Sequence, residues 1–127
     1  MTPDELALHL TDLPAAGNLT LAVLHGSRAR GEARPDADWD IGVLADEAPD
    51  LPVLVAGLSA VLRTDAVDVV DLRTASGLLR FRAARDAVVL LERPVGAFEE
   101  FQLEAVHFWC DAGPVIRAAQ DDVLAGL

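Results

Sequence analysis

The chain has 127 residues, a mass of 13.5 kDa and a formal net charge of −11, which suit one globular domain with its own hydrophobic core. So acidic a protein is unsuited to a nucleic-acid groove, which needs a basic stripe, and the absence of lysine excludes a Walker-type phosphate loop. Cys110 is the only cysteine, which excludes a disulfide framework and a cysteine-based metal site.

The hydrophobic pattern predicts alternating helices and strands. Thr2 is placed to cap a first helix, with Pro3 at its first position and Leu6 and Leu10 on its apolar face. The mostly apolar run at 19–25 is typical of a central strand. The elements expected next are a short helix at 27–34, a strand at 39–44, a helix at 50–63, a strand at 66–72, a helix at 75–85, a strand at 88–91 and a helical tail at 98–124 with a break at 113–114. This order indicates an α/β fold, a small mixed β-sheet with helices packed against it.

No repeat, low-complexity tract or linker divides the sequence. We therefore expect a single domain over residues 1–127, with a core at about 1–93 and a C-terminal helical tail at about 96–127. The first ten residues lack a basic start, and no apolar stretch is long enough to span a bilayer. These features predict a cytoplasmic protein that uses neither a membrane nor direct nucleic-acid contact.

The most informative stretch begins with Gly26 and Ser27, which end the central strand and open the next helix. Backbone N–H groups at such a corner bind phosphate oxygens well, glycine lets a ligand approach the backbone closely, and the serine hydroxyl can donate to a phosphate. An ordinary turn is the alternative interpretation, and the pair alone does not decide between the two.

Two aspartates, Asp38 and Asp40, follow the Gly-Ser pair after a spacing of ten residues. Alternate residues of a strand project from the same face. We therefore expect Trp39, Ile41 and Val43 to face a packed layer while both carboxylates point to the opposite side. Taken alone, the two acids also fit a solvated strand face.

A third carboxylate is expected from the strand at 66–72. Asp68 and Asp71 are three residues apart and so project from opposite faces of that strand. Asp68 is predicted to join the other two aspartates, because its neighbours Val67 and Val69 suit the buried layer. Asp71, near the end of the strand, is predicted to be a turn or cap residue.

Three carboxylates at one point repel one another strongly, by roughly 4 kcal/mol for each pair about 4 Å apart at an effective dielectric near 20. Divalent cations that prefer oxygen ligands relieve such repulsion, and Mg²⁺ suits a mixture of carboxylate and phosphate ligands. Two ions could stabilise both the attacking and the leaving oxygens of a displacement at phosphorus.

The stretch "LHGSRARGEARPDADWDIGVL" with the later "VDVVDL" resembles the minimal nucleotidyltransferases of the DNA polymerase β-like superfamily. Within them it is similar to the MNT antitoxins that are paired with HEPN-domain toxins. The family pattern of Gly-Ser, ten residues and Asp-x-Asp is matched without gaps, and Asp68 matches the third acidic position. The resemblance covers about residues 19–93 and implies the polymerase β-like fold.

The resemblance also implies an activity: transfer of AMP from ATP to a hydroxyl, expected to be a tyrosine of the cognate HEPN toxin, with release of pyrophosphate. Asp68 is the candidate to help deprotonate that hydroxyl. The residues that would contact the triphosphate are Gly26, Ser27, Arg28 and Arg30. The residues that would hold two Mg²⁺ ions are Asp38, Asp40 and Asp68.

Two other functions stay open. One is an antitoxin that neutralises its toxin mainly by forming a complex, although such a protein would not need the acidic residues. The other is a small-molecule nucleotidyltransferase like the aminoglycoside-modifying relatives, which usually need a second domain to complete the acceptor site.

Further residues allow structural and functional interpretations. His25, at the end of a strand, is predicted to be packed or hydrogen-bonded rather than a ligand contact. The aromatic residues of the tail recur at helical spacing, which suits packing on the chain's own sheet or docking of a partner helix. These aromatic residues are Phe98, Phe101, Phe108 and Trp109.

Overall fold

The computed structural model describes residues 1–111 and contains a four-stranded mixed sheet. The strands are β1 (Leu19–His25), β2 (Trp39–Ala45), β3 (Val67–Asp71) and β4 (Val88–Glu92), in the order β3-β2-β1-β4. β1 is antiparallel to both of its neighbours, whereas β2 and β3 are parallel. The predictions of a small mixed sheet and of a central position for the first strand are therefore confirmed.

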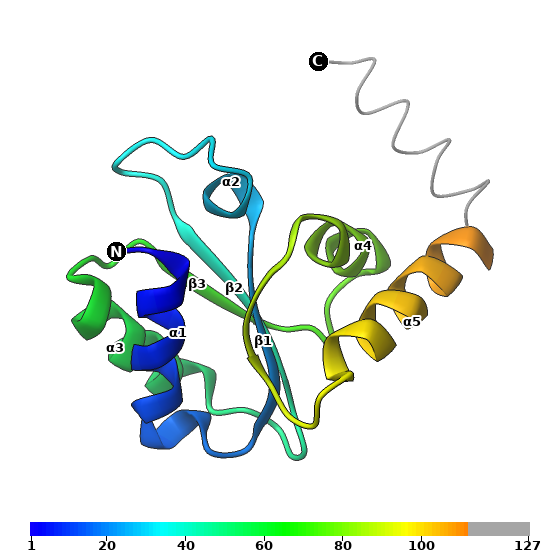
Figure 1. The fold of residues 1–127 in the computed structure, drawn as a ribbon, viewed down its shortest axis with the longest axis horizontal. Coiled ribbons are helices and arrows are strands. Elements are labelled where there is room, and N and C mark those ends of the chain that lie inside the picture. Colours follow the sequence, from blue (N-terminus) through cyan, green and yellow to red (C-terminus); the bar gives the residue numbers. More distant parts are fainter. Residues whose placement is uncertain (112–127) are drawn as a thin grey trace.

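Helices cover both faces of this sheet (Figure 1). α1 (Pro3–Asp12) and α3 (Leu51–Leu62) lie on one face, and α4 (Gly77–Asp86) and α5 (Ala97–Asp111) lie on the other. A short 3-10 helix, η1 (Pro14–Ala16), leads into β1, and a single turn, α2 (Gly26–Ala29), follows it. The α/β architecture inferred from the order of elements is thus the observed one.

The alternation of apolar residues along the strands builds a separate hydrophobic cluster on each face. Ile41 and Val43 of β2 are buried on the side of α1 and α3, together with Trp39. Leu21 and Val23 of β1 are buried on the other side, against α4 and α5. The packed layer expected from Trp39, Ile41 and Val43 is confirmed, and the polar face of β2 is left toward α4.

Side-chain caps set where the helices begin. The hydroxyls of Thr2 and Ser76 each accept a hydrogen bond of 3.2 Å from the backbone N–H three residues on, and Asp50 does the same for α3 at 3.3 Å. α2 is shorter than the helix expected at 27–34. It ends at Ala29 because Gly31 adopts a left-handed φ of 73°, which turns the chain out of the helix.

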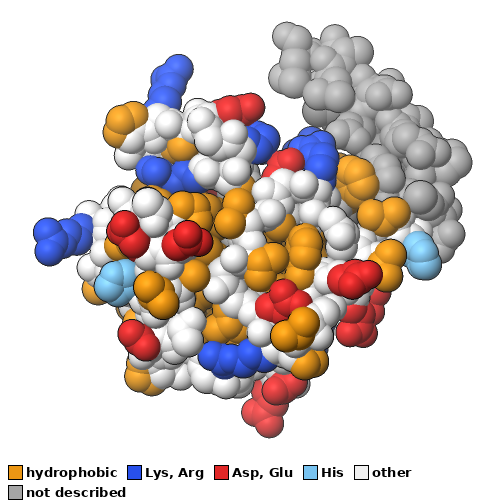
Figure 2. Space-filling view, in the orientation of Figure 1, with side chains coloured by type: hydrophobic (Ala, Val, Ile, Leu, Met, Phe, Trp, Pro, Cys, Tyr) orange, Lys and Arg blue, Asp and Glu red, His pale blue; other side chains and the backbone are white. Residues whose placement is uncertain are grey.

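The described part of the helical tail packs by one side only. Phe101 is buried on the sheet, whereas Phe108 is 47% exposed. The break predicted at 113–114 and the whole of the tail beyond Asp111 lie outside the described residues. None of the helices within residues 1–111 is long and apolar enough to cross a membrane. On the face shown in Figure 2, acidic and basic side chains are interspersed rather than gathered into a basic stripe.

Candidate functional site

Three polar side chains line up across the sheet where β1 ends and β2 and β3 begin. His25 of β1 pairs in register with Asp40 of β2, and Asp40 pairs with Asp68 of β3. Residues directly opposite each other on neighbouring strands project to the same face. Because Trp39 and Ile41 occupy the other face, this row faces α4. Two of the three predicted carboxylates, Asp40 and Asp68, are thus brought together.

The row opens into a cleft of about 250 Å³. One wall is α4, whose residues Leu79, Arg82 and Asp86 are spaced so that they share one face of the helix. The strand–helix corner forms another wall. The residues that line the cleft are His25, Gly26, Arg30, Asp40, Asp68, Val70, Leu79, Arg82 and Asp86.

The corner favours glycine at position 26 for two reasons. Gly26 has a φ of 73°, in the left-handed region that side chains with a Cβ rarely adopt. A Cβ placed there would also collide with the carboxylate of Asp40. The missing side chain therefore lets the backbone of the corner lie directly against one of the acidic residues.

The carboxyl group of Asp40 is in an unfavourable place for a negative charge. Burial raises its pKa, and the nearby charges of Asp68 and Asp38 raise it further, against the opposing effects of His25 and Arg30. A cation in the cleft would remove this penalty. Carboxylate oxygens are the ligands that Mg²⁺ and similar hard cations prefer, so the donor set suits such an ion.

His25 lines the same cleft and is 8% exposed. Burial lowers the pKa of its imidazole, against the opposing charges of Asp40, Asp68 and Asp86, so the ring is neutral near pH 7. Its Nε2 has no hydrogen-bond partner within residues 1–111. The prediction of a packed residue is confirmed, and the unpartnered nitrogen is available to a water molecule or a ligand atom.

The cleft also contains an ion pair that joins the corner to α4. Arg30 donates to Asp86 at 3.0 Å and to Glu32 at 3.0 Å, and Asp86 also accepts from Arg85. The hydrogen bonds from Arg85 and Arg30 lower the pKa of Asp86, so its carboxylate stays charged. Arg30 is therefore present at the predicted site but is engaged by two carboxylates.

Asp38 does not complete the expected trio. It is exposed, lies one residue before β2 and is not among the residues that line the cleft. The hydrogen bonds between β2 and β3 begin with the Trp39 N–H, which donates to the carbonyl of Ala66 at 2.8 Å. Asp38 precedes this bond, so strand geometry does not fix the direction of its side chain. Among the side chains that the structure describes, no three His, Cys, Asp or Glu are grouped closely enough to hold a metal ion. The expected convergence of three carboxylates is thus reduced to an adjacent pair with Asp38 nearby.

Arg28 was expected to contact phosphate, and it points elsewhere. Its guanidinium donates to the carbonyl of Ala37 at 2.8 and 3.1 Å and to that of Pro35 at 3.1 Å. It also stacks on the ring of Trp39, 4.1 Å from the centroid, on the side of β2 away from the cleft. Its contacts hold the connection between α2 and β2 in place.

Ser27 and Asp71 were the other residues predicted at or near the site. Ser27 is half-buried beside Gly26 and is not among the lining residues, so its contact with phosphate stays a prediction. Asp71 is confirmed as a turn residue, because its carboxylate accepts from the Arg73 N–H at 3.0 Å. α4 supplies the lining residues that the sequence did not reveal. Their helical spacing was visible, but nothing in the sequence showed which strands that helix would face.

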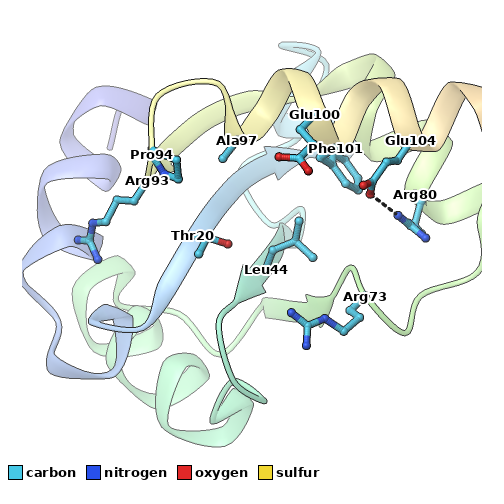
Figure 3. A pocket seen from close by; sticks show the side chains of 10 residues that line it. All are labelled: Thr20, Leu44, Arg73, Arg80, Arg93, Pro94, Ala97, Glu100, Phe101 and Glu104. Atoms are coloured by element: carbon cyan, nitrogen blue, oxygen red, sulfur yellow. Dashed lines mark ion pairs between the residues drawn. The ribbon is translucent and has the colours of Figure 1, made fainter.

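A larger hollow of about 470 Å³ lies at the other end of the strands, between the sheet and α5 (Figure 3). Three arginines line it, and each is engaged by backbone carbonyls or by Glu104, which pairs with Arg80. No strand carboxylate reaches it. It therefore lacks the acidic pair that distinguishes the smaller cleft.

Comparison with known proteins places this cleft in a family context. Residues 13–94 match the family model described as "Polymerase beta, Nucleotidyltransferase". The chain is 35% identical over 111 residues to the protein adenylyltransferase MntA of Aphanizomenon flos-aquae (strain 2012/KM1/D3), with 77% of this chain and 72% of that protein covered. The matched family segment contains every cleft residue named above.

Solved structures show the same fold. The chain resembles a chain of a toxin–antitoxin complex with AMP-PNP, at a TM-score of 0.78 and 28% identity, over 98% of this chain and 99% of the other. It also resembles a chain in the complex of a tri-AMPylated Shewanella oneidensis HEPN toxin with MNT antitoxin, at a TM-score of 0.74 and 26% identity, over 97% and 99% of the two chains. The chain therefore belongs to the polymerase beta nucleotidyltransferase family and is a nucleotidyltransferase.

Proposed function

We propose that this protein is a cytoplasmic antitoxin that transfers AMP from ATP to a tyrosine hydroxyl of a cognate HEPN-domain toxin. The observation that carries the proposal is the carboxylate pair Asp40 and Asp68. The two residues are in register on neighbouring strands and lie in a cleft beside a corner where an added Cβ would collide with the carboxylate of Asp40.

Two further findings support a protein acceptor. The relative MntA is named a protein adenylyltransferase, and one similar solved complex contains an AMPylated HEPN toxin. The present sequence contains no tyrosine, so a tyrosine acceptor has to come from another molecule. A catalytic domain without its own acceptor is consistent with modification of a partner.

We further propose that Asp40 and Asp68 bind Mg²⁺, with Asp38 as an additional ligand. Mg²⁺ commonly uses one or two carboxylates together with phosphate oxygens of the substrate, so an adjacent pair is sufficient to begin a site. When bound, the ions would withdraw charge from the phosphates and orient the reacting oxygens. Asp38 can approach because it is exposed and precedes the strand.

The proposed reaction is a displacement at the α-phosphorus of ATP. The acceptor oxygen forms a bond to this phosphorus, the bond from the phosphorus to the oxygen bridging the α- and β-phosphates breaks, and pyrophosphate leaves with that electron pair. Asp68 takes the hydroxyl proton and can release it to solvent, because its side chain is exposed. The backbone at Gly26 and Ser27 positions the triphosphate.

The test uses ATP labelled at the α-phosphate, Mg²⁺ and the purified cognate toxin. Label should appear on the toxin with the intact chain and should fall at least a hundredfold with Asp40→Asn or Asp68→Asn, because each removes a charged ligand (about 2.7 kcal/mol for that factor). Asp65→Asn is the matched control, since Asp65 is an exposed carboxylate outside the cleft.

Two results would contradict the proposal. Full labelling by the Asp40→Asn and Asp68→Asn variants would remove the carboxylates from the mechanism. Inhibition of the toxin by the intact chain with no label on the toxin would favour neutralisation by complex formation alone.

A further inference from the structure

The triphosphate of ATP brings several negative charges into a cleft that already contains two acidic strand residues. Because this chain has no lysine, only arginine can supply a permanent positive charge from a side chain. Two arginines line the cleft, Arg30 from the corner and Arg82 from α4.

The two arginines differ in how much of their hydrogen-bonding capacity is already used. Arg30 is held by Glu32 and Asp86, with both contacts at 3.0 Å. A phosphate would have to compete with two carboxylates for this guanidinium. Arg28, the other arginine close to the Gly-Ser pair, donates to backbone carbonyls and lies over Trp39.

Arg82, in contrast, has a guanidinium that is not engaged by other described residues. It is exposed, it projects from the same face of α4 as Leu79 and Asp86, and it forms no hydrogen bond or ion pair with any described side chain or backbone group. Its guanidinium presents five N–H donors in a planar fork that matches two phosphate oxygens at once. A phosphate bound to Arg82 would displace no partner from the part of the chain that the structure describes.

We infer that Arg82 is the arginine that contacts the triphosphate of ATP, in place of Arg28 and Arg30. The inference rests on the proposed function, because it concerns the nucleotide of the same cleft. It assigns the positive side chain of the site to α4, outside the Gly-Ser and Asp-x-Asp segment.

The test measures binding of Mg-ATP and of inorganic triphosphate to the intact chain by calorimetry. Arg82→Gln should weaken both by about tenfold, the usual effect of losing one charge-assisted contact, and should raise the KM for ATP in toxin labelling. Arg82→Lys keeps the charge without the fork and should recover part of the affinity. Thermal unfolding should change little, because the side chain is exposed and forms no hydrogen bond or ion pair with the part of the chain that the structure describes.

Arg63→Gln is the matched control for the loss of one positive charge. Arg63 is exposed at the end of α3, on the opposite face of the sheet, and should leave both affinities unchanged. If Arg82→Gln binds ATP and triphosphate as tightly as the intact chain, the assignment of Arg82 is wrong while the proposed function stands. If the intact chain itself binds no ATP in the presence of Mg²⁺, both are wrong.

Discussion

Two glycines close to the cleft have the same backbone conformation but different surroundings. Gly26 and Gly31 both have a φ of 73°. A Cβ at Gly26 would meet the carboxylate of Asp40, whereas a Cβ at Gly31 would meet nothing within 4 Å. Substitutions at the two glycines can therefore separate the effect of backbone strain from the effect of a steric clash with Asp40.

We expect both Gly26→Ala and Gly31→Ala to lose about 1 kcal/mol of unfolding free energy in urea, the usual penalty of a left-handed alanine. Only Gly26→Ala should also push Asp40 aside and reduce labelling of the toxin, by at least tenfold. Equal labelling by the two variants would show that the close approach at the corner has no role in catalysis.

Single residues were predictable from the sequence where strand geometry decides the matter. The alternation rule correctly assigned Asp68 to the cleft and Asp71 to the following turn. The same rule failed for Asp38, because that residue precedes the strand and is free of its ladder. It also gave no guidance on Arg28, whose direction depends on the carbonyl groups of residues seven and nine positions further along the chain.

Among the secondary-structure elements, α4 matters most to the cleft beyond the strands. It places Leu79, Arg82 and Asp86 opposite the acidic pair, and its first turn is capped by Ser76, whose hydroxyl accepts from the Leu79 N–H at 3.2 Å. The position of one lining residue thus depends directly on this cap.

Ser76→Ala should lower the unfolding free energy by about 1 kcal/mol and also weaken binding of Mg-ATP severalfold, because the first turn of the cleft wall would fray. Thr2→Ala removes an equivalent hydroxyl cap from α1, with the same 3.2 Å bond, on a helix that does not line the cleft. Chemical denaturation and calorimetry on both variants provide the comparison. Equal nucleotide affinities in the two would contradict a role for α4.

Most elements could be predicted because their start signals and periodicity are local. Caps, proline positions and apolar spacing located α1, α3 and all four strands to within about two residues. The contribution of α4 to the site could not be derived in this way. It depends on which face of the sheet the helix covers. The structure shows that face, because α4 and Phe101 of α5 pack in one cluster with Leu21 of β1, and these contacts join residues far apart in the sequence.

At the scale of the whole molecule, the net charge of −11 makes the metal-free protein self-repelling. The excess of negative charge is also felt at the cleft. Burial and the charges of Asp68 and Asp38 raise the pKa of Asp40, so a negative charge on this carboxylate is disfavoured. Binding of Mg²⁺ should therefore stabilise the fold as well as serve the reaction.

Addition of Mg²⁺ to ten times its Kd should stabilise the protein by about 1.4 kcal/mol, which corresponds to a rise in Tm of a few degrees. Asp40→Asn should abolish this rise and, without metal, should melt no lower than the intact chain, because it removes a disfavoured charge. Sodium chloride at matched ionic strength is the control, since screening alone stabilises an acidic protein. An equal magnesium-induced rise in both proteins would mean that the ion binds elsewhere.

The contacts of Arg28 bear on the length of the ten-residue segment between Ser27 and Asp38. The side chain leaves α2 and closes onto the carbonyl of Ala37, so the segment forms a loop tied at both ends, with Trp39 as the surface under the tie. A segment closed in this way fixes the number of residues between α2 and β2. Adding or deleting a residue would either break the tie or shift the following strand by one register, which would turn Asp40 away from Asp68.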